Sequence, residues 1–585
     1  MGCALALLAR VSGPAAEKHP TTHRSPIDLA VLPGGRLALT ANHTADSASL
    51  IDIKEGKVLA EQACGRKPSA VAVSPDGRRA AVSNLWSGKV SLLEIDKATL
   101  KTSGEVAVGP LPRGLVFAHD GESLYVAASG ADEVVQVDWS SRKVKQRWTA
   151  PREPRTVALS ADGRKLAVAS TRSAQVRCWD THNGKLLWER RIEDGFNLRG
   201  LSFTPDDEGL ICAHALRRSF PVTKENIEEG WVIDNRLTWF AVAADAKPAM
   251  KQIAVDQRGK AVADLYGLAV DRKAGQLILT GSGTRELVLL DADHIPWTTG
   301  DPGDFLSPKF DLGDHKMRRM QLGGRPLAIA FLDDHSAAVA NYLSDSVQVV
   351  DVEQGKVIRS ITLGGPEEPS LARRGETLFY DAQRSHDQWF SCSTCHVEGH
   401  TCGLNFDTLN DDSYGNPKLT PTLRNVAKTG PWTWHGWQKD LGAAVEKSYL
   451  ETMFGPRPTA AESKAVVAFL ETLDQPPNPR AEESDEVKRG QAVFKGKARC
   501  AKCHKGNEYT SESNYDVKLE PDGSPYRLWN PPSLRGLWDR GPFLHDGRAA
   551  TLKDLLEKHH ESEKLGGEAL TDDERRDLIA FLQSL

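Results

Sequence analysis

A chain of 585 residues is long enough for two to four domains, and its composition of 40% hydrophobic and 26% charged residues is that of a folded globular protein. The formal net charge of −5 offers no basic field for a nucleic acid, so nucleic-acid binding is not expected. No apolar run reaches the ~18 residues of a bilayer-spanning helix, so no transmembrane segment is expected.

Residues 1–20 have two open interpretations, a truncated signal peptide or an unstructured terminus. A short apolar stretch at residues 3–8 is followed by small residues at 12–16, as in a signal peptide. The basic segment that normally precedes the apolar stretch is absent.

Residues 21–365 contain a repeat of about 43 residues. Three strings share one template, an alternating strand that ends in an Asp-Gly turn: PSAVAVSPDG from residue 68, PRGLVFAHDG from 112 and PRTVALSADG from 154. Weaker copies begin near residues 26, 198, 266 and 326. Units of this length with three or four strands are typical of β-propeller blades, so seven copies predict an all-β, seven-bladed propeller.

The later copies are spaced more widely than the first four, which predicts long loops at residues 213–262 and 294–324 on one rim. Such loops are either functional or plain surface decoration. If an active site lies in the propeller, its candidate residues are His214, Arg217, Arg218, His294 and His315.

After residue 365 the pattern becomes helical, and this half of the chain repeats itself. Gly375 matches Gly490, and Phe469 matches Phe581, on either side of a Pro-rich linker that begins at Gln475. Two mainly α domains are therefore predicted, at residues 366–478 and 479–585.

Each helical domain carries one C-x-x-C-H string. Cys392, Cys395 and His396 form the first, and Cys500, Cys503 and His504 form the second. On a helical turn these three side chains share a face, so two thiols can form thioethers while the imidazole reaches the iron of one porphyrin. The Cys and His content predicts only about 0.004 chance matches. A redox Cys pair needs a βαβ context and a zinc site needs more ligands nearby, so we expect two covalently bound haem c groups in two cytochrome c-like domains.

Haem c attachment predicts the compartment, because these thioethers are made in the periplasm or at the cell surface of a bacterium. The opposite side of each iron has more than one candidate ligand. Met453 is the candidate sixth ligand of the first iron, with a plain core methionine as the other interpretation. The second domain has no Met, so its iron is either open or bound by His559 or His560.

Two resemblances follow from these strings. The propeller repeat resembles the YVTN type, most closely at residues 124–128. Residues 420–426, 532–537 and 541–552 resemble the di-haem cytochrome c peroxidase and MauG family. That resemblance implies an electron-transfer haem and a peroxide-reacting haem linked by an aromatic residue, and in some members oxidation of a protein substrate.

The chain departs from the family at two places. Leu544 stands before His545, where the family often has a Met ligand, and Trp434-His435-Gly436 replaces the family's His-Asp-Gly. The resemblance makes His435, His545 and Trp434 candidate catalytic residues. Six tryptophans lie in this half, and the best candidates for the bridge are Trp432 and Trp434; the others are Trp389, Trp437, Trp529 and Trp538.

The leading hypothesis is an exported di-haem oxidoreductase of peroxidase or MauG type, in which the propeller positions a substrate, small molecule or protein. A redox partner protein is expected as electron donor or acceptor. Two alternatives stay open: a pure electron-transfer cytochrome with a propeller docking module, and a propeller-sited dehydrogenase that uses the haems as its electron exit.

Overall fold

The computed structural model describes residues 22–271, 275–311, 316–520 and 526–585. The candidate signal segment and His315 lie outside these residues. Within them, the strands of the first part form seven propeller sheets, as predicted, and the second part is mainly helical.

The first four blades each consist of four consecutive antiparallel strands. Their bounds are β1 (Pro26–Val31), β2 (Leu37–Asn42), β3 (Ser47–Asp52) and β4 (Lys57–Ala63); β5 (Pro68–Val73), β6 (Arg79–Asn84), β7 (Lys89–Asp96) and β8 (Thr99–Ala107); β9 (Pro112–Phe117), β10 (Ser123–Ala128), β11 (Glu133–Asp138) and β12 (Lys143–Thr149); β13 (Pro154–Leu159), β14 (Lys165–Ser170), β15 (Gln175–Asp180) and β16 (Leu186–Arg191).

The last three blades include the only five-stranded sheet of the described propeller, in blade five. Their bounds are β17 (Gly195–Phe196), β18 (Leu201–Phe203), β19 (Gly209–Arg217), β20 (Ile233–Ala241) and β21 (Met250–Ala254); β22 (Leu265–Val270), β23 (Gln276–Gly281), β24 (Glu286–Asp291) and β25 (Met317–Gln321); β26 (Pro326–Phe331), β27 (Ser336–Asn341), β28 (Ser346–Asp351) and β29 (Lys356–Thr362).

The ring closes by side-chain packing. The innermost strand of each blade contacts that of the next, and β26 of blade seven contacts β1 of blade one. Because every blade is built from consecutive strands, no strand is shared across this junction. Ile27 and Leu39 of blade one instead pack in one apolar cluster with Leu327 and Tyr342 of blade seven.

The Asp-Gly pairs form the tight turns expected between strands. Gly77, Gly121 and Gly163 have φ of 70°, 68° and 72°, a conformation that glycine adopts without steric cost. In the first of these turns the Asp76 carboxylate accepts a hydrogen bond from the Arg78 amide at 3.0 Å. Local turn chemistry thus sets where each hairpin reverses.

The prediction of one long loop at residues 213–262 is wrong in part. Three strands of blade five, β19, β20 and β21, run through this segment, and the longest connection within it, residues 218–232, contains α1 (Lys224–Glu228). The nine-residue pairing of β19 with β20 takes up part of the extra length. The segment 294–324 is likewise not all loop, because it contains α2 (Pro308–Asp311) and the outer strand β25.

The two helical units share one plan, a terminal helix pair that crosses next to the C-x-x-C-H segment. In the first unit these elements are α3 (Leu371–Phe379), α4 (Cys392–Cys395), β30 (Asn405–Phe406), β31 (Lys418–Leu419), α5 (Leu441–Lys447), the π-helix Ser448–Thr452 and α6 (Ala460–Leu470). In the second they are α7 (Asp485–Lys495), the 3-10 turn Cys500–Lys502, β32 (Tyr515–Asp516), β33 (Leu528–Trp529), α8 (Leu552–Asp554), the π-helix Leu555–His559 and α9 (Asp572–Ser584).

A glycine allows each helix pair to cross closely. A Cβ atom on Gly375 of α3 would lie 1.8 Å from the carbonyl oxygen of Ala465 in α6. A Cβ atom on Gly490 of α7 would lie 1.9 Å from the carbonyl oxygen of Asp577 in α9. The sequence match between Gly375 and Gly490 therefore marks equivalent helix crossings.

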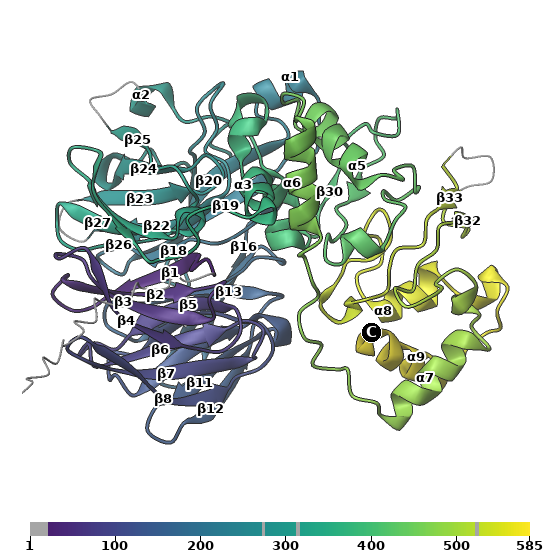
Figure 1. The fold of residues 1–585 in the computed structure, drawn as a ribbon, viewed down its shortest axis with the longest axis horizontal. Helices are drawn as coiled ribbons and strands as arrows, with labels where there is room; N and C mark the ends of the chain where they lie inside the picture. Colours follow the sequence, from purple (N-terminus) through teal and green to yellow (C-terminus); the bar gives the residue numbers. More distant parts are fainter. Residues whose placement is uncertain (1–21, 272–274, 312–315, 521–525) are drawn as a thin grey trace, which may run out of the picture.

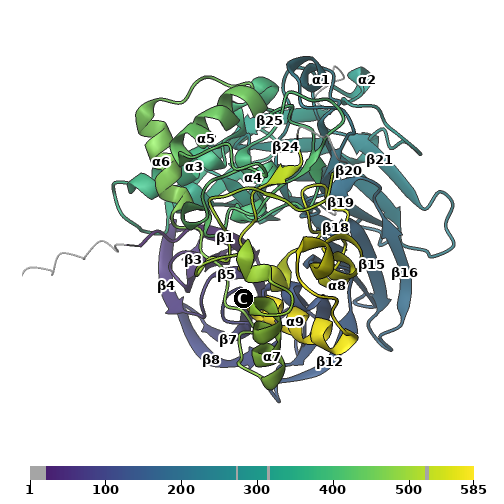
Figure 2. The same ribbon diagram turned by 90° about the vertical axis from the view of Figure 1, so that its right-hand side faces the viewer.

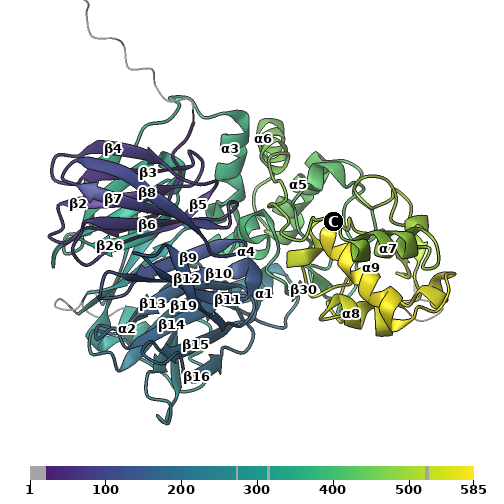
Figure 3. The same cartoon turned by 90° about the horizontal axis from the view of Figure 1, so that it is seen from below.

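The helical units lie over one face of the propeller. Figure 1 shows the propeller on the left and the helical units on the right, and Figure 2 shows both units in front of the propeller ring. From below, α3, α4 and α6 lie against the propeller, and α7 and α9 lie farther out (Figure 3). No helix in the described residues combines the length and apolar composition needed to cross a bilayer.

Candidate functional site

A cavity of about 780 Å³ lies in the helical half and is lined by residues of both units. Its walls include both C-x-x-C-H strings, and much of the remaining lining is apolar. The residues predicted to hold two porphyrins therefore face one continuous space.

In the first unit, the C-x-x-C-H string lies on a buried helical turn. Ser391 caps α4, which places Cys392 and Cys395 one turn apart, and His396 follows directly. The Nδ1 of His396 donates to the carbonyl oxygen of Pro421 at 2.9 Å, which leaves Nε2 available as a metal ligand. Burial lowers the pKa of His396 to about 4, so the imidazole is neutral, as a metal ligand must be.

The second string has the same arrangement. His504 donates from Nδ1 to the carbonyl oxygen of Tyr509 at 3.0 Å, and burial lowers its pKa. Cys500 and Cys503 lie on the preceding turn and line the cavity. Two thiols and one imidazole with its Nδ1 occupied form the donor set that covalent haem c needs, so the residues of both strings fit this cofactor.

Met453 and His560 occupy equivalent places on the cavity wall. Each follows a π-helical turn: the Met453 amide donates to Ser448 at 2.9 Å, and the His560 amide donates to Leu555 at 2.8 Å. π-helical turns are rare and are often found at functional sites. Met453 is 2% exposed, and its Sδ lies 4.0 Å from the Sγ of Cys392.

The structure separates the two histidine candidates of the second unit. His560 lines the cavity, and its pKa falls to about 4 because of burial and, to a lesser degree, the nearby His504. His559 is not part of this lining; its Nε2 lies 3.8 Å from the Asp554 carboxylate and its side chain is 26% exposed. Of these two histidines, only His560 therefore faces the cavity.

A stack of four rings joins the two helical units. Trp437 lies against His435 with ring centres 4.4 Å apart, His435 against Trp529 at 4.3 Å, and Trp529 against His545 at 3.8 Å. The interplanar angles are 21°, 25° and 20°, so the rings are nearly parallel. Trp437 is 49% exposed, whereas His545 is 3% exposed and lines the cavity with His435 and Trp529.

Two backbone hydrogen bonds lock the loops that carry this stack. The Leu419 amide donates to the carbonyl oxygen of His545 at 2.6 Å, and the Asn530 amide donates to that of Trp434 at 2.9 Å. These two bonds are equivalent, because residues 419 and 434 in one unit correspond to residues 530 and 545 in the other. The loop with Trp434-His435-Gly436 in the first unit and the loop with His545-Asp546-Gly547 in the second are therefore each hydrogen-bonded to the other unit.

The candidate catalytic residues meet at this junction. The Trp434 indole lies edge-on to His545, with centres 6.4 Å apart, and its Nε1 donates to Leu419. Burial lowers the pKa of His435, whose Nδ1 donates to the Leu528 carbonyl, and lowers that of His545 to about 4. Both imidazoles are therefore neutral at pH 7.

Two of the tryptophans considered for the aromatic link between the haems, Trp432 and Trp389, lie outside the ring stack. Two tryptophans that do belong to the stack were not among the best candidates from the sequence. Trp432 donates from Nε1 to the Val426 carbonyl within the first unit, and Trp389 is 1% exposed in its core. Trp437 and Trp529 belong to the stack, but no local pattern distinguishes them from other tryptophans. Their role could be predicted only from the tertiary contact between β33 of the second unit and the 434–437 loop of the first.

The propeller holds the first C-x-x-C-H turn directly. The Asp264 carboxylate, which precedes β22, accepts hydrogen bonds from the hydroxyls of Ser391 at 2.5 Å and Thr394 at 2.8 Å. Asn197 of blade five donates to the carbonyl oxygen of Thr394 at 3.0 Å. The N-terminal cap of α4 is thus held partly by propeller residues.

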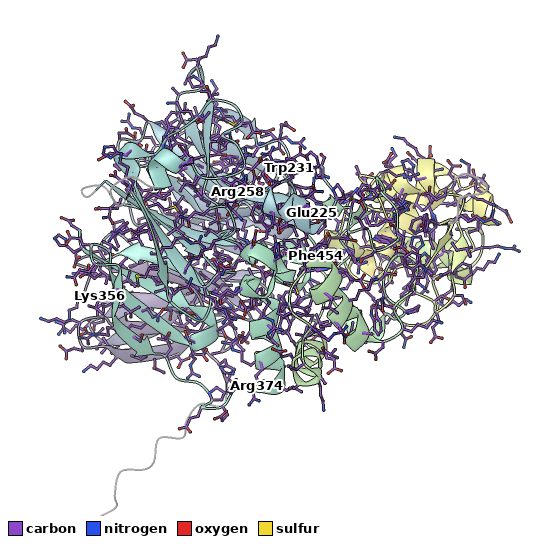
Figure 4. The ribbon with its side chains drawn as sticks, turned by 90° about the horizontal axis from the view of Figure 1, so that it is seen from above. Glu225, Trp231, Arg258, Lys356, Arg374 and Phe454 are labelled. Carbon is purple, nitrogen blue, oxygen red and sulfur yellow. The ribbon has the colours of Figure 1, made fainter. Side chains whose placement is uncertain are left out.

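The connection between β19 and β20 also supports the first unit. Val222 and Ile227 share an apolar cluster with Trp389 and Met453. Figure 4 labels Glu225 and Trp231 of this connection on the side of the propeller that faces the helical units. The connection is therefore part of the packing of the first unit.

The described candidate residues for a propeller active site are held in separate structural contacts. His214 is fully buried in β19, with Nε2 2.8 Å from the Thr238 hydroxyl. Arg217 pairs with Asp194, Arg218 pairs with Asp301, and the exposed His294 pairs with Asp291. Each of these described side chains has a structural partner of its own.

Comparison with protein families supports this division of the chain. The family model described as di-haem cytochrome c peroxidase matches residues 369–481, and that of cytochrome c matches residues 487–585. A model described as a lactonase seven-bladed β-propeller matches residues 58–143. The first two families imply haem c as cofactor, and together the matches confirm a propeller followed by cytochrome c-like units.

Individual relatives point the same way. Methylamine utilization protein MauG of Methylophilus methylotrophus is 30% identical over 290 residues, which cover 38% of this chain and 84% of that protein. Hydrazine synthase subunit gamma of Kuenenia stuttgartiensis is 25% identical over 279 residues, covering 38% of this chain and 79% of that protein. A chain of the solved hydrazine synthase from the same organism matches with a TM-score of 0.52 and 26% identity, over 58% of this chain and 99% of that one.

Proposed function

Since the chain belongs to the MauG-like di-haem cytochrome c peroxidase family, we propose that it is an exported bacterial oxidoreductase that transfers electrons from a redox partner protein to peroxide. The observation that carries the proposal is the continuous cavity lined by both C-x-x-C-H strings and by the stacked rings between them. In the periplasm or at the cell surface, such a protein would receive electrons one at a time.

We assign two covalent haem c groups to the two strings. Cys392 and Cys395 would form the thioethers of the first and Cys500 and Cys503 those of the second, with His396 and His504 as iron ligands. When bound, haem c supplies a one-electron centre if its iron is six-coordinate, and a peroxide-reactive centre if one position is open. The Nδ1 hydrogen bonds of His396 and His504 would orient both rings.

The stacked rings would couple the two units. His435 and Trp529 come from different units and are in ring contact, so they provide a short route for electrons between the two sides of the cavity. The neutral imidazole of His545 would donate from Nε2 to the Glu520 carboxylate, 3.1 Å away, which leaves Nδ1 to accept a proton at the cavity wall. Trp434, edge-on to His545, would hold that ring in place.

The propeller would serve as a positioning platform. Asp264 and Asn197 contact the cap of the first attachment turn, so a partner protein or substrate that binds the propeller would do so close to the first haem. Hydrazine synthase subunits beta and gamma carry the word subunit in their names, and this likeness supports a protein partner here as well.

The test is to mix the reduced holoprotein with hydrogen peroxide in the presence of a one-electron donor. Each peroxide should consume two electrons and two protons and yield two waters, so two donor molecules should be oxidised per peroxide. A variant with Cys500→Ala and Cys503→Ala is the control. Donor oxidation no faster than in that control would refute the peroxidase proposal.

A second candidate is a pure electron-transfer cytochrome. The equivalent placement of Met453 and His560 favours it, because both could serve as sixth ligands and leave neither iron open. A wholly low-spin spectrum in both oxidation states, unchanged by cyanide, would support this candidate over peroxide chemistry. A dehydrogenase site in the propeller lacks comparable support, because His214 and Arg218 are engaged in structural contacts.

A further inference from the structure

Three successive blades place an arginine at the same position of their innermost segment. Arg113 follows the proline that begins β9, Arg155 follows the proline that begins β13, and Arg199 lies two residues before β18. Blade six has Tyr266 at the corresponding position. Because neighbouring innermost strands run side by side around the ring, these side chains form an arginine half-ring at one mouth of the propeller.

The first cytochrome unit inserts one carboxylate into this half-ring. Arg113 donates to Glu398 at 2.9 Å, and Arg155 also pairs with it. Arg155 donates in addition to the Tyr266 hydroxyl at 3.1 Å. Burial raises the pKa of Glu398, but the arginines outweigh this effect and hold it well below its ordinary value. One carboxylate thus serves two arginines.

The third arginine is buried and forms no ion pair of its own with a described residue, although Asp264 and Glu398 lie close enough to act on its charge. Arg199 is 3% exposed, and none of its three guanidinium nitrogens has a hydrogen-bond partner among the described residues. Its guanidinium lies over the Tyr266 ring at 5.0 Å. The other carboxylates nearby are engaged, since Glu153 pairs with Arg172 and Asp264 accepts the Ser391 and Thr394 hydroxyls.

A second arginine on the same mouth also has a buried nitrogen without a partner. Arg325, at the start of blade seven, is 4% exposed, and its Nε has no partner in the described part of the chain. Its guanidinium lies over the ring of Tyr380 at 3.5 Å and over that of Tyr342 at 5.4 Å. Burial raises the pKa of both tyrosines, so their hydroxyls remain neutral hydrogen-bond donors.

Burying a guanidinium group without hydrogen-bond partners raises the free energy of the folded state unless a bound group supplies those partners. Removing an unpaired ion from water costs several kcal/mol, and a cation–π contact returns only about 2 kcal/mol. Buried donors without partners in a native protein indicate a group that completes the site. Two guanidinium forks and two phenol hydroxyls are together the donor set for an oxyanion, since guanidinium N–H groups match paired oxygens in spacing and charge.

We propose that Arg199, Arg325 and Tyr380 bind a small oxyanion, a carboxylate or an inorganic oxyanion, between the propeller mouth and the first cytochrome unit. The two arginines belong to the propeller and Tyr380 belongs to the cytochrome unit. Tyr380 lies close enough to both arginines to respond to their charge, so the bound anion would bridge both parts. It would lie next to Glu398, which follows His396 by two residues. This inference does not depend on the peroxide reaction.

The test is isothermal titration of the holoprotein with sodium acetate and, separately, with sodium phosphate, in a zwitterionic buffer that contains neither anion. Saturable one-site binding of at least one anion is expected; acetate alone would identify a carboxylate site, and phosphate alone an inorganic oxyanion site. Arg199→Gln and Arg325→Gln should each weaken this binding at least ten-fold. Arg191→Gln, at a side chain 61% exposed, is the matched control and should bind as wild type.

Two results would overturn the proposal. One is the lack of saturable binding of either anion by the wild-type holoprotein. The other is unchanged affinity in both Gln variants when their melting temperatures show that they are folded. If Arg199→Gln does not fold, Arg199→Lys keeps the charge and removes the fork; weaker binding in that variant supports the site, and unchanged binding rejects it.

Discussion

The imidazole of His435 lies flat against the indole of Trp529, with ring centres 4.3 Å apart and planes 25° apart. One ring belongs to the first cytochrome unit and the other to the second. Because His545 stacks on the opposite face of Trp529, at 3.8 Å, this indole is held between histidines of both units. Trp529 is therefore the central contact between the two predicted haem sites.

Replacing Trp529 by Leu should slow electron transfer between the units, because it removes the ring that touches both imidazoles. We expect the peroxide-dependent oxidation of a one-electron donor to slow at least ten-fold. Stopped-flow spectroscopy of the reduced holoprotein would measure it. Trp529→Phe retains an aromatic ring and is the control; if Leu and Phe variants have equal rates, the stack does not carry electrons.

The ligand assignments can be separated by single substitutions. If His560 and Met453 are the sixth ligands, as the electron-transfer candidate requires, His560→Ala and Met453→Ala should each convert one iron from low-spin to high-spin, because each removes the side chain that follows the π-helical turn. Under the peroxidase proposal, one of the two irons is open, and the substitution on its side should leave the spin state unchanged. Optical and EPR spectra would detect both changes. His559→Ala is the matched control, since His559 faces Asp554, and it should leave the spectra unchanged. A spectral change in the His559 variant alone would reverse the assignment.

The helix crossing of the second unit should not tolerate a methyl group at residue 490. Gly490→Ala would place a Cβ atom 1.9 Å from the Asp577 carbonyl oxygen, so α7 and α9 must move apart at a cost of about 2–3 kcal/mol. Thermal unfolding should show a lower melting temperature. At Gly442 in α5 the nearest atom is a side-chain oxygen at 3.2 Å, so Gly442→Ala should be neutral or slightly stabilising. An equal decrease in melting temperature in both variants would show that residue 490 does not limit how closely α7 and α9 pack.

Removing the Asp264 carboxylate should loosen the first attachment turn. In Asp264→Ala the buried hydroxyls of Ser391 and Thr394 lose their acceptor, at a cost of about 1–3 kcal/mol. Asp264 has φ of 57°, which Asn tolerates better than Ala, so Asp264→Asn should retain more stability. The melting temperatures and haem content of the two variants would be compared. Wild-type values in the Ala variant would mean that the propeller does not support this turn.

A buried carboxyl in the propeller predicts a pH dependence. Burial raises the pKa of Asp256 from 3.8 to about 6, although the Val262 and Asn235 amides donate to it. Between about pH 4 and 6 the folded state therefore holds a proton that the unfolded state has lost, so this contribution to stability falls as pH rises, by about 1.4 kcal/mol per pH unit. Above pH 6 it stays constant.

Asp256→Asn should remove that slope. The melting temperature of wild type relative to the variant should fall as pH rises from about 4 to 6 and then level off. The Asn side chain adds a constant offset, because the Val262 and Asn235 amides donate to different oxygens of Asp256 and Asn has an NH2 donor in place of one of them. If the difference in melting temperature between wild type and variant does not change over this pH range, Asp256 keeps an ordinary pKa.

Much of the architecture could be predicted from local patterns. Strand alternation and Asp-Gly turns indicate each hairpin, because these signals act between neighbours in the chain. The nine-residue strands β19 and β20 were missed because their extra length was taken for a loop. The matches of Gly375 with Gly490 and of the two C-x-x-C-H strings revealed two helical units for the same local reason.

By itself the amino-acid sequence determined the propeller, the two cytochrome c-like units and the thiols and imidazoles predicted to hold haem. The tertiary structure alone decided that His560 rather than His559 faces the cavity, that Trp529 lies between His435 and His545, and that Glu398 enters the arginine half-ring. The physical reason is that periodicity and turn chemistry are local. These last contacts join residues of different units, whose proximity depends on how complete domains pack.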